Sequence, residues 1–210
     1  MGTRRGSGHV PDHGRRTPVT TYRLQMGAAL TFDDARRLVP YLHDLGITDV
    51  YLSPVLAAAP GSTHGYDVVD HTRISEVMGG RAGLERLADD VHAAGMGLVL
   101  DIVPNHMAVP TPAWHNLPLW SVLRDGPDSP YASWFDVSVE APILMPVLGA
   151  RIGKVLADEQ LVLDRMTVPT EPERGEQWVL RYFDHVFPVA EGTQSLPMHV
   201  LVDRQHYRLA

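Results

Sequence analysis

The feature that most constrains the fold is an alternation of short apolar runs with amphipathic helical patterns between residues 20 and 103. Apolar side chains recur at helical spacing from Phe32 to Leu45, and Thr31 stands at the N-cap position with Asp34 three residues later. A second amphipathic pattern runs from Leu84 to Ala94 and is closed by a glycine. We therefore predict two helices, each lying between two strands.

Three strands are predicted, at residues 21–25, 47–54 and 97–103. The second and third are apolar at most positions, which is typical of parallel strands covered by helices. Such βα repeats fit either a doubly wound sheet or a (β/α)8 barrel. The first βα turn lacks G-x-G-x-x-G, and polar residues gather after strands two and three, where barrel enzymes carry their sites. We predict an α/β fold, an incomplete (β/α)8 TIM barrel of about three βα units.

The rhythm breaks after Met107. Text rich in Pro, Trp and Gly runs to about Gly149, and short β-like pieces are predicted at residues 154–156, 160–163 and 178–182. We predict that residues 19–107 form the first part of the barrel and that residues 108–210 form a subdomain inserted after strand three. Residues 1–18 are rich in Arg and Gly without the apolar stretch of a secretory signal, so we expect a disordered tail.

Composition excludes several classes of function. The net charge is -7 and no basic stripe is present, so we expect no nucleic-acid partner. The chain has no cysteine, which rules out disulfides and thiolate zinc sites. No apolar run is long enough to cross a membrane, so we expect no membrane partner and a cytoplasmic location.

The densest polar patch runs from Gly61 to His71 and contains His64, Tyr66 and Asp67. An aromatic ring can cover the apolar face of a pyranose while charged groups bind its hydroxyls. This mixture on a loop is typical of a sugar-binding site. The alternative is a turn-rich loop whose Asp and His side chains cap backbone groups.

A second patch, Asp101 to His106, ends the third predicted strand. A carboxylate in an apolar strand must be paired or hydrogen-bonded, and Pro104 leaves Asn105 and His106 at the rim. Asp, Asn and His can all ligate metals, but one Asp and one His are too few for a transition-metal site. We therefore predict no metal and no cofactor.

These two patches resemble glycoside hydrolase family 13, the α-amylase clan. Leu98 to His106 resembles the clan's first signature region on barrel strand three, and Gly65 to Asp67 resembles its element after strand two. Within the clan, the text is most similar to the maltooligosyl trehalose synthase family. That likeness lies at residues 22–25, 52–56, 60–71, 105–109, 126–132, 181–185 and 204–210.

The resemblance implies roles for individual residues. Tyr66 would stack on the glucose whose bond is broken, and His106 would hydrogen-bond a hydroxyl of that ring. Asp67 and His64 would contact substrate, Asp67 at the end of the pocket that limits which glucan fits. Two residues would be structural: Asp101, paired with a basic group, and Asn105.

The resemblance also implies what the chain does not contain. Retaining glycosidases need two carboxyl groups about 5–5.5 Å apart. In this clan they follow strands four and five, and none of the 25 Asp and Glu residues fits the nucleophile motif. We expect the catalytic residues to lie beyond residue 210 and this chain alone to be inactive.

The activity implied for the parent enzyme is conversion of the reducing-end α-1,4 bond of a maltooligosaccharide into an α,α-1,1 bond. Its partner would be an α-1,4-glucan. Two alternatives remain: a fragment of another enzyme of the clan, or a non-catalytic glucan-binding module.

Overall fold

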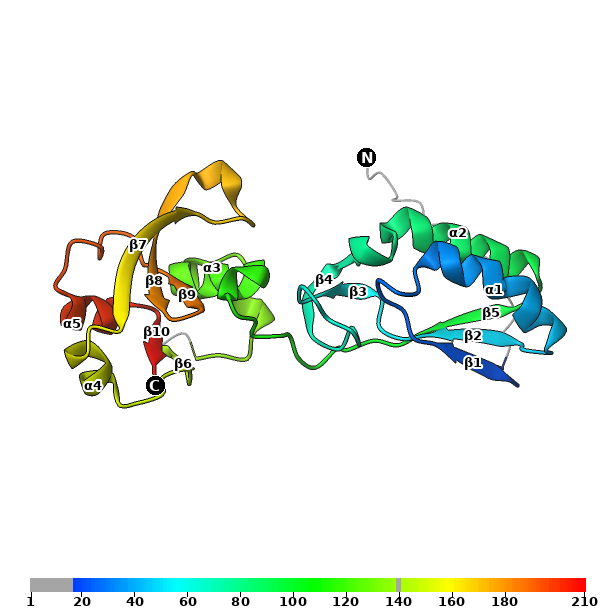
Figure 1. The fold of residues 1–210 in the computed structure, drawn as a ribbon, viewed down its shortest axis with the longest axis horizontal. Coiled ribbons are helices and arrows are strands. Elements are labelled where there is room, and N and C mark those ends of the chain that lie inside the picture. Colours follow the sequence, from blue (N-terminus) through cyan, green and yellow to red (C-terminus); the bar gives the residue numbers. More distant parts are fainter. Residues whose placement is uncertain (1–16, 139–140) are drawn as a thin grey trace, which may run out of the picture.

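The computed structural model describes residues 17–138 and 141–210. They form two lobes that lie side by side (Figure 1): a first lobe of residues 17–100 and a second lobe from residue 113 onward. An extended connecting segment, residues 101–112, joins them. A disordered tail is predicted at residues 1–18, and residues 1–16 of that range lie outside the described residues.

The first lobe is built on a parallel sheet of β1 (Thr21–Leu24), β2 (Asp49–Leu52) and β5 (Gly97–Leu100), in that order. Helices α1 (Phe32–Asp44) and α2 (Gly80–Ala93) cover one face of this sheet (Figure 1). They are joined by an Arg36–Asp90 ion pair of 2.7 Å. The three predicted strands and two predicted helices are therefore confirmed.

Strand β5 ends three residues earlier than predicted, at Leu100. The last backbone hydrogen bond to the neighbouring strand β2 is donated by the Asp101 N–H to the Leu52 carbonyl at 3.0 Å. Because β2 itself ends at Leu52, the chain beyond Asp101 has no strand beside it on that side.

Helix α1 starts where the sequence predicts. The Thr31 hydroxyl accepts from the Asp34 N–H at 3.3 Å, and the Asp34 carboxylate accepts from the Thr31 N–H at 3.0 Å, which completes a capping box. Gly46 follows the helix at φ +81°, a conformation that glycine adopts without steric cost. The buried face of the helix packs on the sheet through Phe32, Ala35, Val39 and Leu42.

The loop predicted between strand two and Gly80 contains a hairpin. Strands β3 (Leu56–Ala58) and β4 (Val68–Ile74) pair antiparallel with two register shifts. Strand β3 was not predicted from the sequence, because two of its three residues are alanine, which has low strand propensity. The hairpin carries the Gly61–Asp67 loop at its tip, so it places the predicted patch on a rigid support.

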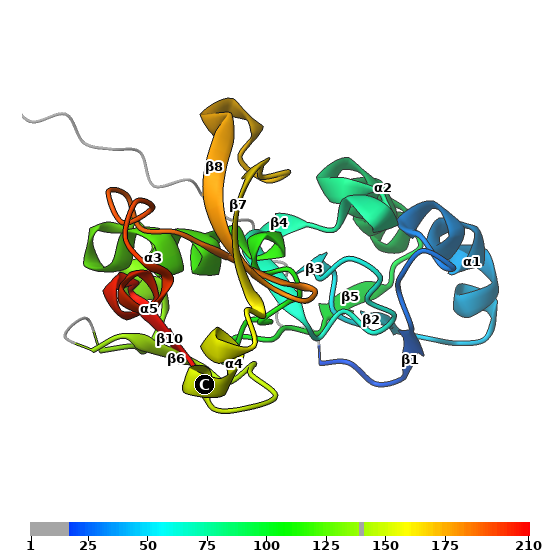
Figure 2. The same cartoon turned by 60° about the vertical axis from the view of Figure 1, so that its left-hand side comes forward.

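The second lobe has its own core, formed around Trp120, Phe187 and Tyr207. Its antiparallel sheet is β7 (Leu161–Thr167), β8 (Glu176–Tyr182) and β9 (His185–Pro188), and β6 (Ile143–Met145) pairs in parallel with β10 (Tyr207–Leu209). Figure 2 shows β7 and β8 projecting as a ribbon above the rest of the lobe. The lobe's helices are α3 (Leu117–Asp125), α4 (Ile152–Ala157) and α5 (Met198–Leu201). Short 3-10 helices lie at Glu76–Met78, Ala113–His115, Gly126–Asp128, Ala132–Trp134, Pro172–Arg174 and Val202–Arg204.

One local prediction in the second lobe is wrong, and one helix was not predicted. The β-like piece expected at residues 154–156 lies in helix α4, which spans six residues and is too short to show a helical period in the sequence. Helix α3 was not predicted, although the signals for it are present. Asn116 caps it by accepting from the Leu119 N–H at 3.0 Å, and a proline occupies its first turn.

A buried ion pair joins α3 to the segment before β8. Arg124 Nη1 contacts Glu171 Oε2 at 2.5 Å, with side chains only 10% and 7% exposed. The Trp120 indole N–H donates to the same oxygen at 3.1 Å, and Asp125 pairs with Arg124 at 2.8 Å. Charges this deep require such partners, so the network holds the lobe in one arrangement.

Candidate functional site

The candidate site lies where β1, β2 and β5 end, and its centre is a hydrogen bond between Tyr66 and Asp101. The Tyr66 hydroxyl donates to Asp101 Oδ2 at 2.5 Å, and the Tyr51 hydroxyl donates to the same oxygen at 3.0 Å. Arg23 donates to the Tyr66 oxygen at 3.3 Å, and its guanidinium lies 5.6 Å from the centre of the Tyr51 ring. Two tyrosines from separate parts of the first lobe therefore meet at the Asp101 carboxylate, and Arg23 joins them through Tyr66.

The sheet register explains this convergence. Arg23 is opposite Tyr51, and Tyr51 is opposite Val99. Residues two apart in an extended chain point to the same side, so Asp101 follows Val99 on that face. The sequence did not single out Arg23 or Tyr51 as site residues. The signals in the sequence that could have pointed to them are a charged residue inside the predicted strand 21–25 and a tyrosine inside the predicted strand 47–54.

The basic partner predicted for Asp101 is not bonded to it directly. Among the described residues no salt bridge joins Asp101 to a basic side chain, and two phenols donate to its Oδ2 instead. Arg23 reaches the carboxylate through the Tyr66 hydroxyl. The hydrogen bond to Asp101 raises the pKa of Tyr66, and the hydrogen bond to Tyr66 raises the pKa of Arg23.

The Gly61–Asp67 loop is held by its own side chains. Ser62 donates to the Asp67 carboxylate, and its oxygen accepts from the Gly65 N–H at 3.0 Å. Gly65 is buried at φ +77°, and a Cβ there would lie 2.7 Å from the Pro54 carbonyl oxygen. Only glycine fits both the conformation and the space, so this residue sets the direction in which Tyr66 leaves the loop.

His64 lies beside Tyr66 in this loop. Their rings are stacked at 6.0 Å with an interplanar angle of 24°, and His64 Nδ1 accepts from the Tyr66 backbone N–H at 3.0 Å. A nitrogen that accepts carries no proton, so this bond places the imidazole proton of neutral His64 on Nε2. The same Nδ1 lies 3.7 Å from Asp67 Oδ1, and it makes no ion pair there while it accepts.

His106 connects the end of the first lobe to this loop. Its Nε2 lies 3.2 Å from the Tyr66 carbonyl oxygen, which can only accept, so Nε2 donates. Its Nδ1 lies 3.0 Å from Asn105 Oδ1. The Asn105 oxygen can likewise only accept, so this second contact is a hydrogen bond only in the doubly protonated ring. In neutral His106, Nδ1 is left to accept from a ligand hydroxyl.

The structure thus brings all six predicted residues into one network. Tyr66 is 38% exposed, and His64, Asn105 and His106 are exposed as well, whereas Asp67 and Asp101 are half-buried. The exposed groups form a surface with one aromatic ring and several hydrogen-bonding atoms. This arrangement can bind a polyhydroxylated ring.

A hollow of about 540 Å³ opens next to His106. Its walls come from β4, from the connecting segment and from the second lobe. The lining residues are His71, Thr72, Pro104, Asn105, His106, Met107, Trp134, Phe135 and Asp136.

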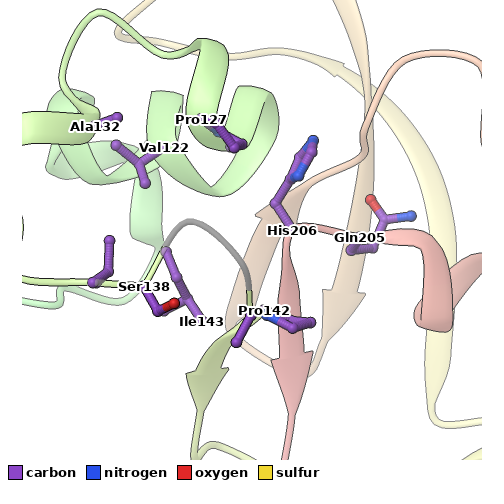
Figure 3. Close-up of a pocket in the computed structure, with 11 residues that line it drawn as sticks. Val122, Pro127, Ala132, Ser138, Pro142, Ile143, Gln205 and His206 are labelled. Carbon is purple, nitrogen blue, oxygen red and sulfur yellow. The ribbon is translucent and has the colours of Figure 1, made fainter.

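A smaller cavity of about 200 Å³ lies inside the second lobe, between α3 and β10 (Figure 3). His206 points toward the corner after α3, where a Cβ on Gly126 would meet its ring. Gln205 bonds the Ala190 N–H at 2.7 Å and the Leu201 carbonyl at 2.8 Å. The walls are otherwise mostly apolar, and Gln205 joins parts of the lobe, so we assign this cavity to packing.

The next two observations concern the predictions that the chain has no metal and no membrane partner. In residues 17–138 and 141–210, no group of three or more His, Asp or Glu side chains is arranged to hold a metal ion. Over the same ranges, no helix has both the length and the apolar character needed to cross a membrane. The absence of a metal from the reaction stays a prediction.

Comparison of this chain with known proteins shows the family to which it belongs. The model of the α-amylase catalytic domain matches residues 36–193. A Mycobacterium tuberculosis protein, provisionally described as a maltooligosyl trehalose synthase, is 40% identical over 201 residues, which cover 91% of this chain and 24% of that protein. The intracellular maltogenic amylase of Bacillus subtilis is 34% identical over 97 residues, or 46% of this chain and 15% of that protein.

Solved structures agree. Maltooligosyltrehalose synthase from Arthrobacter ramosus aligns with a TM-score of 0.77 at 42% identity, covering 91% of this chain and 24% of that one. A hypothetical maltooligosyl trehalose synthase from Sulfolobus tokodaii aligns with a TM-score of 0.74 at 35% identity, covering 93% and 25%. This chain spans about a quarter of the length of these relatives. The match to the family model covers most of the residues that build both lobes, and the chain belongs to the family of α-amylase catalytic domains.

Proposed function

We propose that this chain is the N-terminal part of an enzyme that converts the reducing-end α-1,4 bond of maltooligosaccharides into an α,α-1,1 bond. One observation carries the proposal. Similarity to the trehalose-forming relatives runs through 91% of the chain and both lobes, whereas the maltogenic amylase matches only 46%. A likeness to glucan-cleaving amylases in general would account for about half of the chain.

The arrangement of strands and helices in the two lobes supports this proposal. The β1–β2–β5 sheet with α1 and α2 would be the first three strands of a TIM barrel with the two helices that connect them, and residues 19–107 would belong to that barrel. Residues 108–210, with a separate core, would be a subdomain inserted after the third barrel strand. The Tyr66–Asp101–His106 network then lies at the C-terminal rim, the end at which barrel enzymes bind substrate.

The proposed roles follow from the geometry of the rim. Tyr66, fixed by Asp101 and Arg23, would present its ring to the glucose at the scissile bond. His106 and His64 would hydrogen-bond the sugar, and Asp67 would limit the pocket. Asp101 and Asn105 would position these groups, since Asp101 accepts from Tyr51 and Tyr66 and Asn105 Oδ1 lies 3.0 Å from His106 Nδ1.

The two catalytic carboxyl groups are, in this proposal, not among the residues of this chain. The rim carboxylates described here are Asp67 and Asp101, and each accepts a hydroxyl hydrogen bond from the protein. A retaining reaction would form a covalent glucosyl intermediate on the nucleophile, and the freed glucose would attack it through its anomeric hydroxyl. Water must then be excluded from the intermediate.

The test is product analysis with the complete protein. Incubated with maltopentaose, it should form a chain of unchanged length that ends in trehalose and has lost its reducing end. Release of glucose and maltose with retention of reducing ends would instead identify a hydrolase. Binding without any conversion would favour the glucan-binding module.

We also propose that the reaction needs no metal. Treatment of the complete protein with a chelator should leave its rate unchanged. A loss of activity that calcium restores would refute this part of the proposal.

A further inference from the structure

The hollow beside His106 shares one wall with the candidate site and takes the other from the second lobe. Asn105 and His106 belong to both, while Trp134 and Asp136 line the hollow from the second lobe. The site and the hollow are therefore continuous. A linear ligand held at Tyr66 and His106 has room to continue in this direction.

The two walls are fixed relative to each other. The Ala108 N–H donates to the Val68 carbonyl at 2.8 Å, which ties the connecting segment to β4. The side chain of Asn116 is fully buried, and its amide donates to the Ala108 carbonyl at 2.8 Å while its oxygen caps α3. The connecting segment is thus anchored to both lobes at the edge of the hollow.

Trp134 is the aromatic residue that this hollow exposes most. Its side chain is 44% exposed, and its ring contacts Tyr131 at 5.1 Å with an interplanar angle of 82°. Its backbone N–H donates to the Tyr131 carbonyl at 2.9 Å. A single exposed tryptophan is common on protein surfaces. This one is held by a neighbouring ring within a hollow that continues the candidate site.

The hollow also supplies groups that bind hydroxyls. His71 Nε2 lies 2.8 Å from the Val103 carbonyl, so it carries the proton, and Nδ1 of the neutral ring is an acceptor. Asp136 is exposed and adds a carboxylate. An aromatic ring with a few acceptors is the combination that holds a pyranose.

We propose that Trp134 is a second glucan contact, stacking on a glucosyl unit farther along the glucan than the one held by Tyr66 and His106. The inference rests on the proposed function in one respect, namely that the ligand is an α-1,4-glucan. Trp134 would then favour longer glucans over short ones, because only a longer chain reaches both aromatic rings.

The experiment measures calorimetric binding of maltose and maltoheptaose to the complete protein, together with kcat/KM for maltoheptaose. Trp134→Ala should weaken maltoheptaose binding about five- to tenfold and leave maltose binding unchanged. Trp134→Phe should restore most of the loss, since it keeps an aromatic face. Trp178→Ala is the matched control, because this tryptophan is similarly exposed, at 38%, on the projecting β7–β8 ribbon.

Each result bears on the proposal. Maltoheptaose binding by Trp134→Ala at the wild-type level would overturn it, as would equal losses for maltose and maltoheptaose. Equal effects of Trp134→Ala and Trp178→Ala would overturn it as well. If the complete protein binds maltoheptaose through Trp134 but forms no trehalose ends, the proposed reaction fails while the glucan contact stands.

Discussion

The Tyr66 hydroxyl donates a 2.5 Å hydrogen bond to the Asp101 carboxylate, and this bond joins the tip of the β3–β4 hairpin to the end of β5. This hydrogen bond holds Tyr66, a loop residue, beside the ends of the strands of the parallel sheet. The backbone carbonyl of the same tyrosine accepts from His106, so the loop is held at two points. An aromatic ring fixed in this way loses little conformational entropy when a ligand stacks on it.

Replacing Tyr66 should reduce catalysis by the complete protein. Tyr66→Ala removes a stacking surface worth on the order of 1 kcal/mol or more, so kcat/KM should fall at least about fivefold. His106→Ala should also lower kcat/KM. Tyr41→Ala is a suitable control, because Tyr41 is 60% exposed on α1 and takes no part in the rim network. Wild-type kinetics in both rim variants would remove the site assignment.

The pKa of Tyr66 should lie above that of an ordinary phenol, because its hydroxyl donates to a carboxylate. Asp101→Asn should lower this pKa toward the ordinary value, which an ultraviolet pH titration referenced to Tyr66→Phe can measure. A Tyr66 pKa that does not respond to Asp101→Asn would contradict the bond.

The same shift links Tyr66 to stability. A pKa raised in the folded state stabilises the protein below the unfolded pKa, near 10, and this contribution disappears as the pH rises through the folded value. Wild type should therefore lose more stability than Tyr66→Phe above about pH 10. Thermal unfolding at several pH values tests the difference.

The Arg124–Glu171 pair should matter for the stability of the second lobe. Glu171→Ala leaves a buried guanidinium without one of its two carboxylates, and breaking a buried pair costs about 3–5 kcal/mol. We expect a clear drop in the thermal unfolding temperature of the complete protein. Glu176→Ala is the control, because its pair with Arg165 is exposed and should contribute about 1 kcal/mol or less. Equal shifts for the two variants would disprove the role of burial.

The 210-residue chain by itself should be inactive and unfold without a sharp transition. Strands β1 and β5 are the two edges of a three-stranded parallel sheet, and Leu100 and Ile102 next to the site are 40% and 65% exposed. Open edges and wet apolar side chains favour aggregation. Calorimetry and a maltopentaose assay test both parts. A cooperative transition together with trehalose-end formation would overturn the prediction.

The sequence by itself determined the elements whose signals are local. Thr31 and Asp34 start α1, and the apolar period up to Leu42 gives its buried face, because capping and helical spacing depend on near neighbours. The apolar strands predicted the parallel sheet for a similar reason. The residues of the Gly61–His71 and Asp101–His106 patches were also recognisable, since their types and order stand in the printed text.

Only the tertiary structure decided how these residues meet. Asp101 was expected to pair with a basic group, but two phenols donate to its Oδ2. The register of β1, β2 and β5 places Tyr51 beside it, and the β3–β4 hairpin brings Tyr66 to it. Arg23 joins the site for the same reason. Register and the approach of distant loops depend on contacts between residues far apart in the chain, which a local pattern does not encode.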